Sequence, residues 1–174
     1  MKVRPTTHAN GTNPRLVHCL ALLLMVASGC MQGRNVQANS PIQSRVDSLA
    51  AKLNAREIGK VEVLQIPPSV ETRTRITPEM LEVQYSYKLT IRDLRGQFHQ
   101  KELAEAVRET KVQPGPNMPD LRWGIVFYSL DGTRVLGLYF DRNGSKGAVG
   151  DVPVSFGGHR LFKWLDNNFS ASFR

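Results

Sequence analysis

The sequence predicts an α+β fold, an antiparallel β-sheet with a C-terminal meander of strands and two or three helices packed on it. Residues 41–54 carry apolar side chains at helical spacing. Residues 83–91 alternate strictly between apolar and polar, as a half-buried strand does. Residues 122–156 place Asp-Gly, Asn-Gly and Gly-Asp pairs at regular intervals between apolar runs, which is typical of successive hairpins.

The first predicted element is a helix that begins after Ser40. In Ser40-Pro41-Ile42-Gln43, the serine can accept from the first turn, the proline needs no partner there, and Gln43 can reach back as in a capping box. The apolar stripe in the next residues predicts a helix docked on the domain; its members are Ile42, Val46, Leu49, Ala50 and Leu53.

Two strands and a second helix are predicted next. Residues 61–66 form an apolar, β-branched run stopped by Pro67-Pro68. In residues 83–91 we expect one buried face, made of Val83, Tyr85, Tyr87, Leu89 and Ile91. Residues 97 or 98 to 110 are good helix formers, and Pro114-Gly115-Pro116 ends any continuation.

The predicted meander has strands at 122–130, 134–142, 146–149 and 152–156. The first two are apolar on both faces, so we expect them at the centre of the sheet, covered on both sides. Pro153 indicates an edge position for the last strand. After Gly157-Gly158, a short helix ending at Asn167-Asn168 has Leu161, Phe162, Trp164 and Leu165 on its inner side.

Residues 1–29 have the layout of an export signal. Lys2, Arg4 and Arg15 precede an apolar run at 16–27, and no acidic residue is present. Twelve helical residues cover about 18 Å, short of the ~30 Å of a bilayer core, so this run is too short for a stable membrane-spanning helix.

The end of this segment, Val26-Ala27-Ser28-Gly29-Cys30, resembles the lipobox of bacterial lipoprotein precursors. The resemblance covers only the first thirty residues. It implies cleavage after Gly29, a diacylglyceryl group on the Cys30 sulfur and acylation of the freed amine. Met31 stands where inner-membrane lipoproteins of enteric bacteria often carry Asp, which implies the outer membrane, facing the periplasm. The alternative is an ordinary secretory signal followed by an unrelated cysteine.

Composition constrains the chain from Cys30 onward. Residues 1–29 hold three of the 23 basic residues and none of the 15 acidic ones, which leaves a net charge of +5. With one remaining cysteine no intramolecular disulfide can form. We expect residues 30–40 to be the lipidated cysteine and a flexible tether of about 18 Å. Residues 41–174 are enough for a single domain.

The nearest approach to a catalytic pair is Ser155 with His159. A hydrolase elbow Gly-x-Ser-x-Gly needs glycines two residues on either side of the serine, and here Gly157 fits whereas Pro153 does not. The alternative is a strand end followed by a helix start. A triad would also need a carboxylate such as Asp131, Asp141 or Asp151.

Metal and phosphate sites have weaker support. His99 and Glu102 are spaced to share one helix face, but a surface pair of this kind is far more often solvated, and we assign no metal or cofactor. Asn143-Gly144-Ser145-Lys146-Gly147 lacks the order of a phosphate-binding loop, and hairpin turns account for it.

Two binding surfaces are candidates. Arg73, Arg75, Lys88 and Arg92, with Arg95 nearby, could form a basic strip for an acidic partner or headgroup; otherwise they are a solvated face. The aromatic residues could line a groove for a glycan or peptide, or could simply be core; they are Trp123, Tyr128, Tyr139 and Trp164.

Together these observations predict a non-enzymatic cell-envelope lipoprotein, tethered to the membrane through Cys30, that binds an envelope protein or a cell-wall component. In the periplasm we expect no nucleic-acid partner, since the polyanions there are headgroups, lipopolysaccharide and peptidoglycan. The alternative is a periplasmic hydrolase built around Ser155 and His159. Inhibition of an envelope enzyme is a third hypothesis.

Overall fold

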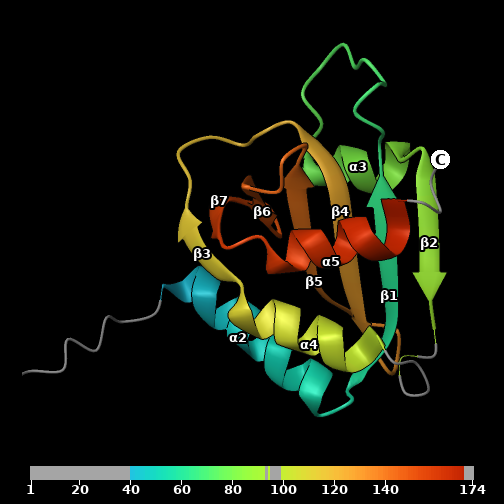
Figure 1. Cartoon of the computed structure of the whole chain (residues 1–174), viewed down its shortest axis with the longest axis vertical. Coiled ribbons are helices and arrows are strands. Elements are labelled where there is room, and N and C mark those ends of the chain that lie inside the picture. Colours follow the sequence, from blue (N-terminus) through green and yellow to red (C-terminus); the bar gives the residue numbers. More distant parts are fainter. Residues whose placement is uncertain (1–39, 93, 95–98, 171–174) are drawn as a thin grey trace, which may run out of the picture. The chain divides into compact units, whose positions relative to one another are not determined.

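The α+β fold is confirmed in a computed structural model that describes residues 40–92, 94 and 99–170 (Figure 1). Residues 39–174 form one compact unit. The predicted signal segment, Gly29, Cys30 and the tether up to residue 39 lie outside the described residues. The elements in chain order are α2 (Pro41–Asn54), β1 (Ile58–Gln65), α3 (Pro78–Gln84), β2 (Tyr87–Ile91), α4 (His99–Glu109), β3 (Lys111–Pro114), β4 (Leu121–Ser129), β5 (Arg134–Asp141), β6 (Lys146–Val149), β7 (Val152–Gly157) and α5 (Arg160–Phe169).

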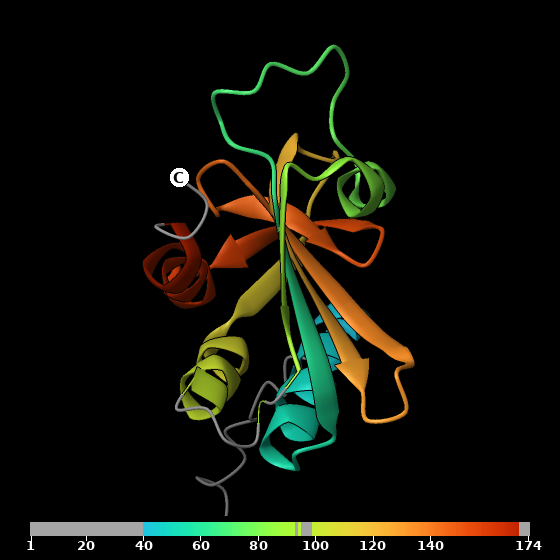
Figure 2. The same ribbon diagram turned by 90° about the vertical axis from the view of Figure 1, so that its right-hand side faces the viewer.

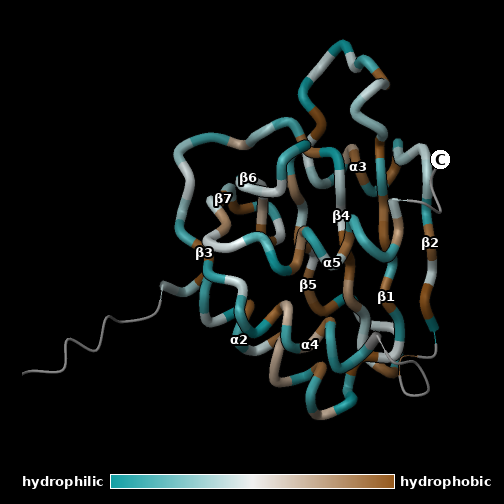
Figure 3. Tube along the Cα trace, in the orientation of Figure 1, coloured by the Kyte–Doolittle hydropathy of each residue, from teal (hydrophilic) through white to brown (hydrophobic). Residues whose placement is uncertain are grey.

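All strand pairings are antiparallel, and the sheet order is β2-β1-β4-β5-β6-β7-β3. The long apolar strands β4 and β5 lie at the centre, as their sequences predict, and their middle residues are buried on both faces. Figure 3 shows hydrophobic stretches along β1 and β5, whereas the loop before α3 is largely hydrophilic.

Helices α2, α4 and α5 cover one face of the sheet, which we call the helix-covered face (Figure 2). From the sheet, Val63, Ile125, Phe127, Leu138 and Phe140 point into this layer, and each is buried. The helices contribute Val46, Leu49, Ala50, Leu53, Leu103, Ala104, Ala106, Val107, Leu161, Trp164, Leu165 and Phe169. This is the larger core; its described buried members lie between Val46 and Phe169, and the partly buried Ile42 packs against them.

The opposite face, which we call the α3 face, carries a smaller core under α3 and the segment that precedes it. Its buried members are Leu64, Ile66, Ile76, Leu81, Leu121, Val126, Tyr139 and Ala148. Among the residues that the structure describes, the buried members of both cores lie between residues 46 and 169, so the fragment 39–174 contains all of them. That fragment therefore has what it needs to fold by itself.

The predicted start of α2 is confirmed, but Gln43 has a different role. Ser40 Oγ accepts from Gln43 N at 3.2 Å, which satisfies a free amide of the first turn. The Gln43 side chain does not reach back. It donates to Thr110 O at 3.2 Å and accepts from Val112 N at 2.9 Å. Gln43 thus occupies the backbone groups at the free edge of β3, where another strand would otherwise pair.

The strand predicted for residues 83–91 is wrong in its first half. Val83 and Gln84 end α3, and β2 begins only at Tyr87. Thr77 starts this helix because its hydroxyl accepts from Met80 N, with Pro78 at the first helical position and Glu79 in the first turn. The backbone becomes extended at Tyr85. The alternation of apolar and polar residues that marks β2 therefore continues, in the sequence, into the last residues of α3.

The prediction that Pro153 marks the sheet edge is also wrong. β3, a strand that the sequence did not reveal, pairs with β7 and forms the edge. Pro153 is tolerated because it lies where the β3 ladder ends, and its carbonyl accepts from Gly115 N at 2.8 Å.

Candidate functional site

A cluster of charged and aromatic side chains lies on the same face of the sheet as α3, and Figure 2 shows that α3 covers only one end of that face. We call this cluster the polar face and define it by Lys60 and Glu62 of β1, Lys88 of β2, Tyr128 of β4 and Arg134 of β5. The strand register brings them together, since Lys60 pairs with Tyr128 and Tyr128 with Arg134. Neighbouring strands place paired residues on the same face of a sheet.

Glu62 is the centre of the polar face. Its carboxylate lies 3.0 Å from Lys60 Nζ, 3.1 Å from Lys88 Nζ and 2.9 Å from Tyr128 Oη. Its side chain is only 12% exposed, whereas those of Lys60 and Lys88 are 27% and 33% exposed. A nearly buried carboxylate is stable here because two ammonium groups and one phenol satisfy it.

The pKa shifts fix the charge of this centre. Burial alone would raise the pKa of Glu62, but hydrogen bonds from Lys60, Tyr128 and Lys88 outweigh it, so the pKa is lowered and Glu62 is ionised at neutral pH. Burial and then the hydrogen bond to Glu62 raise the pKa of Tyr128 to about 12, which keeps the phenol protonated. Lys60 Nζ also lies 3.6 Å from the centroid of the Tyr128 ring, as in a cation–π contact.

A second tyrosine–glutamate pair adjoins the first. Tyr139 is fully buried, and its hydroxyl hydrogen-bonds to Glu82 of α3. Arg134 donates to Glu82 Oε1 at 2.6 Å and to Tyr139 Oη at 2.7 Å. Gly137 makes room for this phenol, since a Cβ there would lie 2.2 Å from Tyr139 Oη. Arg134 therefore links α3 to the sheet beside Tyr128.

These shifts take the pKa values of the polar face further from the value that a general acid or base needs. A general acid or base works best with a pKa near the ambient pH. The pKa of Glu62 is shifted down and those of both tyrosines up, the latter by burial first and then by their glutamate partners. The hollow between α3 and β5, about 290 Å³, is lined by Pro78, Glu79, Glu82, Arg134, Gly150 and Asp151. The described lining residues bring charged groups together and include no serine, threonine or cysteine.

Ser155 lies near the end of a strand and His159 at the start of a helix. This is the arrangement that the sequence indicated as the alternative to a catalytic pair. Ser155 lies within β7, paired with Gln113 and Lys146. His159 is exposed at the N-cap of α5 and makes no side-chain capping bond. Asp131 and Asp141 are engaged in their own turns, Asp131 with Ser129 and Thr133. The described residues hold no hydrogen-bonded Ser155–His159–carboxylate triad.

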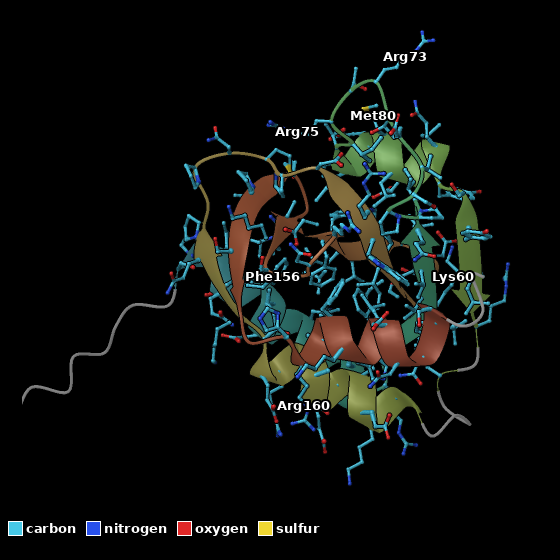
Figure 4. All side chains as sticks on the ribbon, turned by 45° about the horizontal axis from the view of Figure 1, so that its top comes forward. Lys60, Arg73, Arg75, Met80, Phe156 and Arg160 are labelled. Carbon is cyan, nitrogen blue, oxygen red and sulfur yellow. The ribbon has the colours of Figure 1, made fainter. Side chains whose placement is uncertain are left out.

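The basic residues of the predicted strip are dispersed over two segments. Arg73 and Arg75 lie on the loop before α3, and Figure 4 shows Arg73 pointing away from the domain. Arg75 donates to Met118 O at 2.8 Å. Lys88 instead joins Lys60 around Glu62, and Arg92 is exposed just after β2.

The four aromatic residues do not form a groove. Trp123 and Trp164 are buried in the core of the helix-covered face, while Tyr139 and Tyr128 belong to the α3 face. Alternate residues of β4 and β5 point to opposite faces, so these side chains cannot line one surface. The interpretation of these aromatics as core is correct for Trp123, Tyr139 and Trp164.

The turn at 143–147 is used internally. Asp141 Oδ1 accepts from Ser145 N at 3.0 Å and from Lys146 N at 3.2 Å, so a carboxylate occupies the amides that a phosphate would need. The side chain of His99 is outside the described residues. Among the residues that are described, no group of three or more His, Cys, Asp or Glu side chains could hold a metal ion.

Sequence reasoning missed Lys60 and Glu62. A signal was present, since Glu62 is the one charged residue in the mainly apolar run 61–66 that predicts a strand. A charge at such a position requires partners nearby.

Comparison with protein families, with curated proteins and with solved structures finds no match for this chain. In the part of the chain that the structure describes, no helix has the length and apolar character needed to cross a bilayer.

Proposed function

We propose that this chain is a cell-envelope lipoprotein, a non-catalytic binding domain held at a membrane through Cys30. Its polar face binds acidic groups of an envelope protein or of a cell-wall component. The outer membrane, facing the periplasm, is the location that the lipobox resemblance and Met31 favour. Two acyl chains or more on Cys30 would hold the domain there without help from the folded part.

The observation that carries the binding role is the arrangement around Glu62. At the β1–β2 end of the polar face Lys60 and Lys88 outnumber Glu62 by one charge, and their ammonium groups remain partly exposed. The hollow beside Arg134 also holds the carboxylates of Glu79, Glu82 and Asp151, so the positive excess belongs to the β1–β2 end. The positions of the two ammonium groups are fixed by Glu62 and Tyr128, so little side-chain freedom is lost when a ligand binds. A pre-ordered surface with a small positive excess suits carboxylate or phosphate groups.

The binding role is tested by adding charge without removing a contact of Glu62. Thr90 is exposed and pairs with Glu62 in the sheet register. The test immobilises the fragment 39–174 and measures its retention of membrane-stripped envelope proteins or of purified peptidoglycan. Thr90→Glu should lower this retention by at least about tenfold, because the added carboxylate would repel the acidic groups of the ligand. The matched control is Gln113→Glu, at an exposed position of β3. Equal retention by the two variants and the unsubstituted fragment would contradict a binding role for the polar face.

Membrane attachment is tested separately on the full chain. Intact-mass analysis of the protein from its native envelope should show a chain that begins at Cys30 and carries diacylglyceryl and acyl groups. Cys30→Ser should release the protein from membranes after high-salt and carbonate washes. A free thiol or an uncleaved leader in the native protein would rule out the anchor.

A further inference from the structure

A second hollow, of about 310 Å³, lies between α2 and β5. Its floor is apolar and consists of Leu49, Val135 and Leu136. Its α2 side is polar, with Ser44, Arg45, Ser48 and Lys52. We call this hollow the α2 groove. It shares no lining residue with the polar face or with the hollow beside α3.

The α2 side of the groove is a line of donors. Ser44, Ser48 and Lys52 are spaced by four residues and so lie above one another on the helix, with Arg45 beside them. Arg45 is placed by the β6–β7 turn, since a Cβ on Gly150 would lie 2.9 Å from its Nη2. The described lining residues provide two cations and the Ser48 hydroxyl, while the Ser44 hydroxyl donates to Ser40 O at 3.5 Å. No carboxylate is among these described lining residues, so the surface is complementary to an anion.

Two acidic residues stand near the groove, and neither removes its positive charge. Glu57 pairs with Lys52 at 3.2 Å, but both side chains are about half exposed, and the exposed Arg56 lies between the two in the chain, just after α2. Asp151 lies in the turn beside Gly150 and lines the hollow on the other side of that turn. Exposed pairs of this kind are weak and open readily to a competing anion.

Chain connectivity relates the groove to the membrane. The tether from Cys30 enters α2 at Pro41, and ten such residues have a typical span of about 18 Å. Arg45 is four residues further on, about 6 Å along the helix axis. If Cys30 carries the anchor, Arg45, Lys52 and Arg56 are held within reach of the headgroups, at the high local concentration that a short tether produces.

We propose that the α2 groove binds the phosphate of anionic phospholipid headgroups in the membrane that holds the Cys30 anchor. The anchor supplies attachment and the groove supplies orientation, so that α2 faces the bilayer. This inference rests on the proposed lipoprotein function. Its test uses the fragment 39–174, which lacks Cys30, so the result does not depend on whether the cysteine is lipidated.

The experiment measures cosedimentation of this fragment with vesicles of phosphatidylglycerol and phosphatidylcholine in equal parts, and with vesicles of phosphatidylcholine alone. The fragment should bind the anionic vesicles selectively and dissociate as salt is added. Each basic residue near an anionic surface contributes about fivefold, so Arg45→Ala/Lys52→Ala should weaken binding about 25-fold. Circular dichroism melting verifies that this variant is folded.

The matched control is Arg142→Ala/Lys163→Ala, which removes the same charge from exposed positions outside the groove. It should weaken vesicle binding by less than about threefold, because neither residue lines the groove that the proposal turns toward the bilayer. Equal losses in the two double variants would overturn the groove in favour of diffuse charge. Equal binding to both kinds of vesicle would overturn it altogether. If inorganic phosphate competes for the groove as strongly as the anionic vesicles do, the groove is a site for free phosphate instead. None of these results bears on Cys30 or on the polar face.

Discussion

The two faces of the sheet are built from the same strands but on different physical principles. Phe127 and Tyr128 are consecutive residues of β4, and one enters the helix-covered core while the other meets Glu62. Three helices seal the first face, which is held by apolar burial. The α3 face is covered at one end, and its other end is held by ion pairs and phenol hydrogen bonds that water still reaches.

This difference separates stability from recognition. The apolar side chains packed beneath the helices cannot contact a partner without unfolding, and a ligand can reach this face only at its rim, in the α2 groove. An ordered polar face can exchange water for ligand groups. The proposed binding role therefore belongs to the face that contributes less to the free energy of unfolding. Substitutions on the two faces should differ in size and in pH dependence.

The largest effect is expected from Phe127→Ala on the helix-covered face. Phe127 is fully buried, so its truncation leaves a cavity and should destabilise the domain by about 3–5 kcal/mol. Its neighbour on the other face is the comparison. Tyr128→Phe removes one hydrogen bond to Glu62 but leaves its ion pairs with Lys60 and Lys88. It should lower the free energy of unfolding by about 1 kcal/mol. Urea unfolding of the two variants measures the difference, and equal losses would contradict the division between the faces.

A smaller but pH-dependent effect is expected from Glu62→Gln. At neutral pH the amide leaves Lys60 and Lys88 without their shared carboxylate, which should cost about 1–3 kcal/mol. The folded-state pKa of Glu62 is lowered from 4.5, so the stability it contributes is present above pH 4.5 and is lost as the pH falls through the lower folded-state value. The difference in unfolding free energy between wild type and variant should shrink in acid. A difference that stays constant down to low pH would show that the carboxylate charge is not what stabilises this cluster.

The apolar pattern of β4 and β5 predicted both their central position and a cover on each face. It did not identify the cover of the α3 face, because α3 is short and its last residues continue the alternation of β2. Thr77-Pro78-Glu79 has the residues of a helix start, but the stronger alternating pattern that follows favoured a strand.

The candidate site was harder to predict than the fold. Glu62 and Tyr128 are separated by 66 residues and meet only because β1 pairs with β4 in one register. A single sequence shows that Glu62 needs partners but not which strands will supply them. Lys88 was predicted as a candidate binding residue and lies in the polar face. Arg73 and Arg75, predicted with it, lie elsewhere, since they are loop residues with no strand register to align them. Cys30 is a different case, because its signal is local and is read from the residues that precede it.

The smallest effect is expected from Val83→Lys, which tests whether residue 83 ends α3 or belongs to the strand that the alternating pattern predicts. Val83 is 78% exposed on the last turn of α3, so Val83→Lys should change the unfolding free energy by less than about 0.5 kcal/mol. On the buried face of a strand, the same change would place an unpaired ammonium group in an apolar layer and cost several kcal/mol. Leu81→Lys, on the same short helix but fully buried under it, provides the contrast and should unfold the α3 face. If Val83→Lys proved as damaging as Leu81→Lys, residue 83 would face the sheet, and the α3 face would be sealed rather than open.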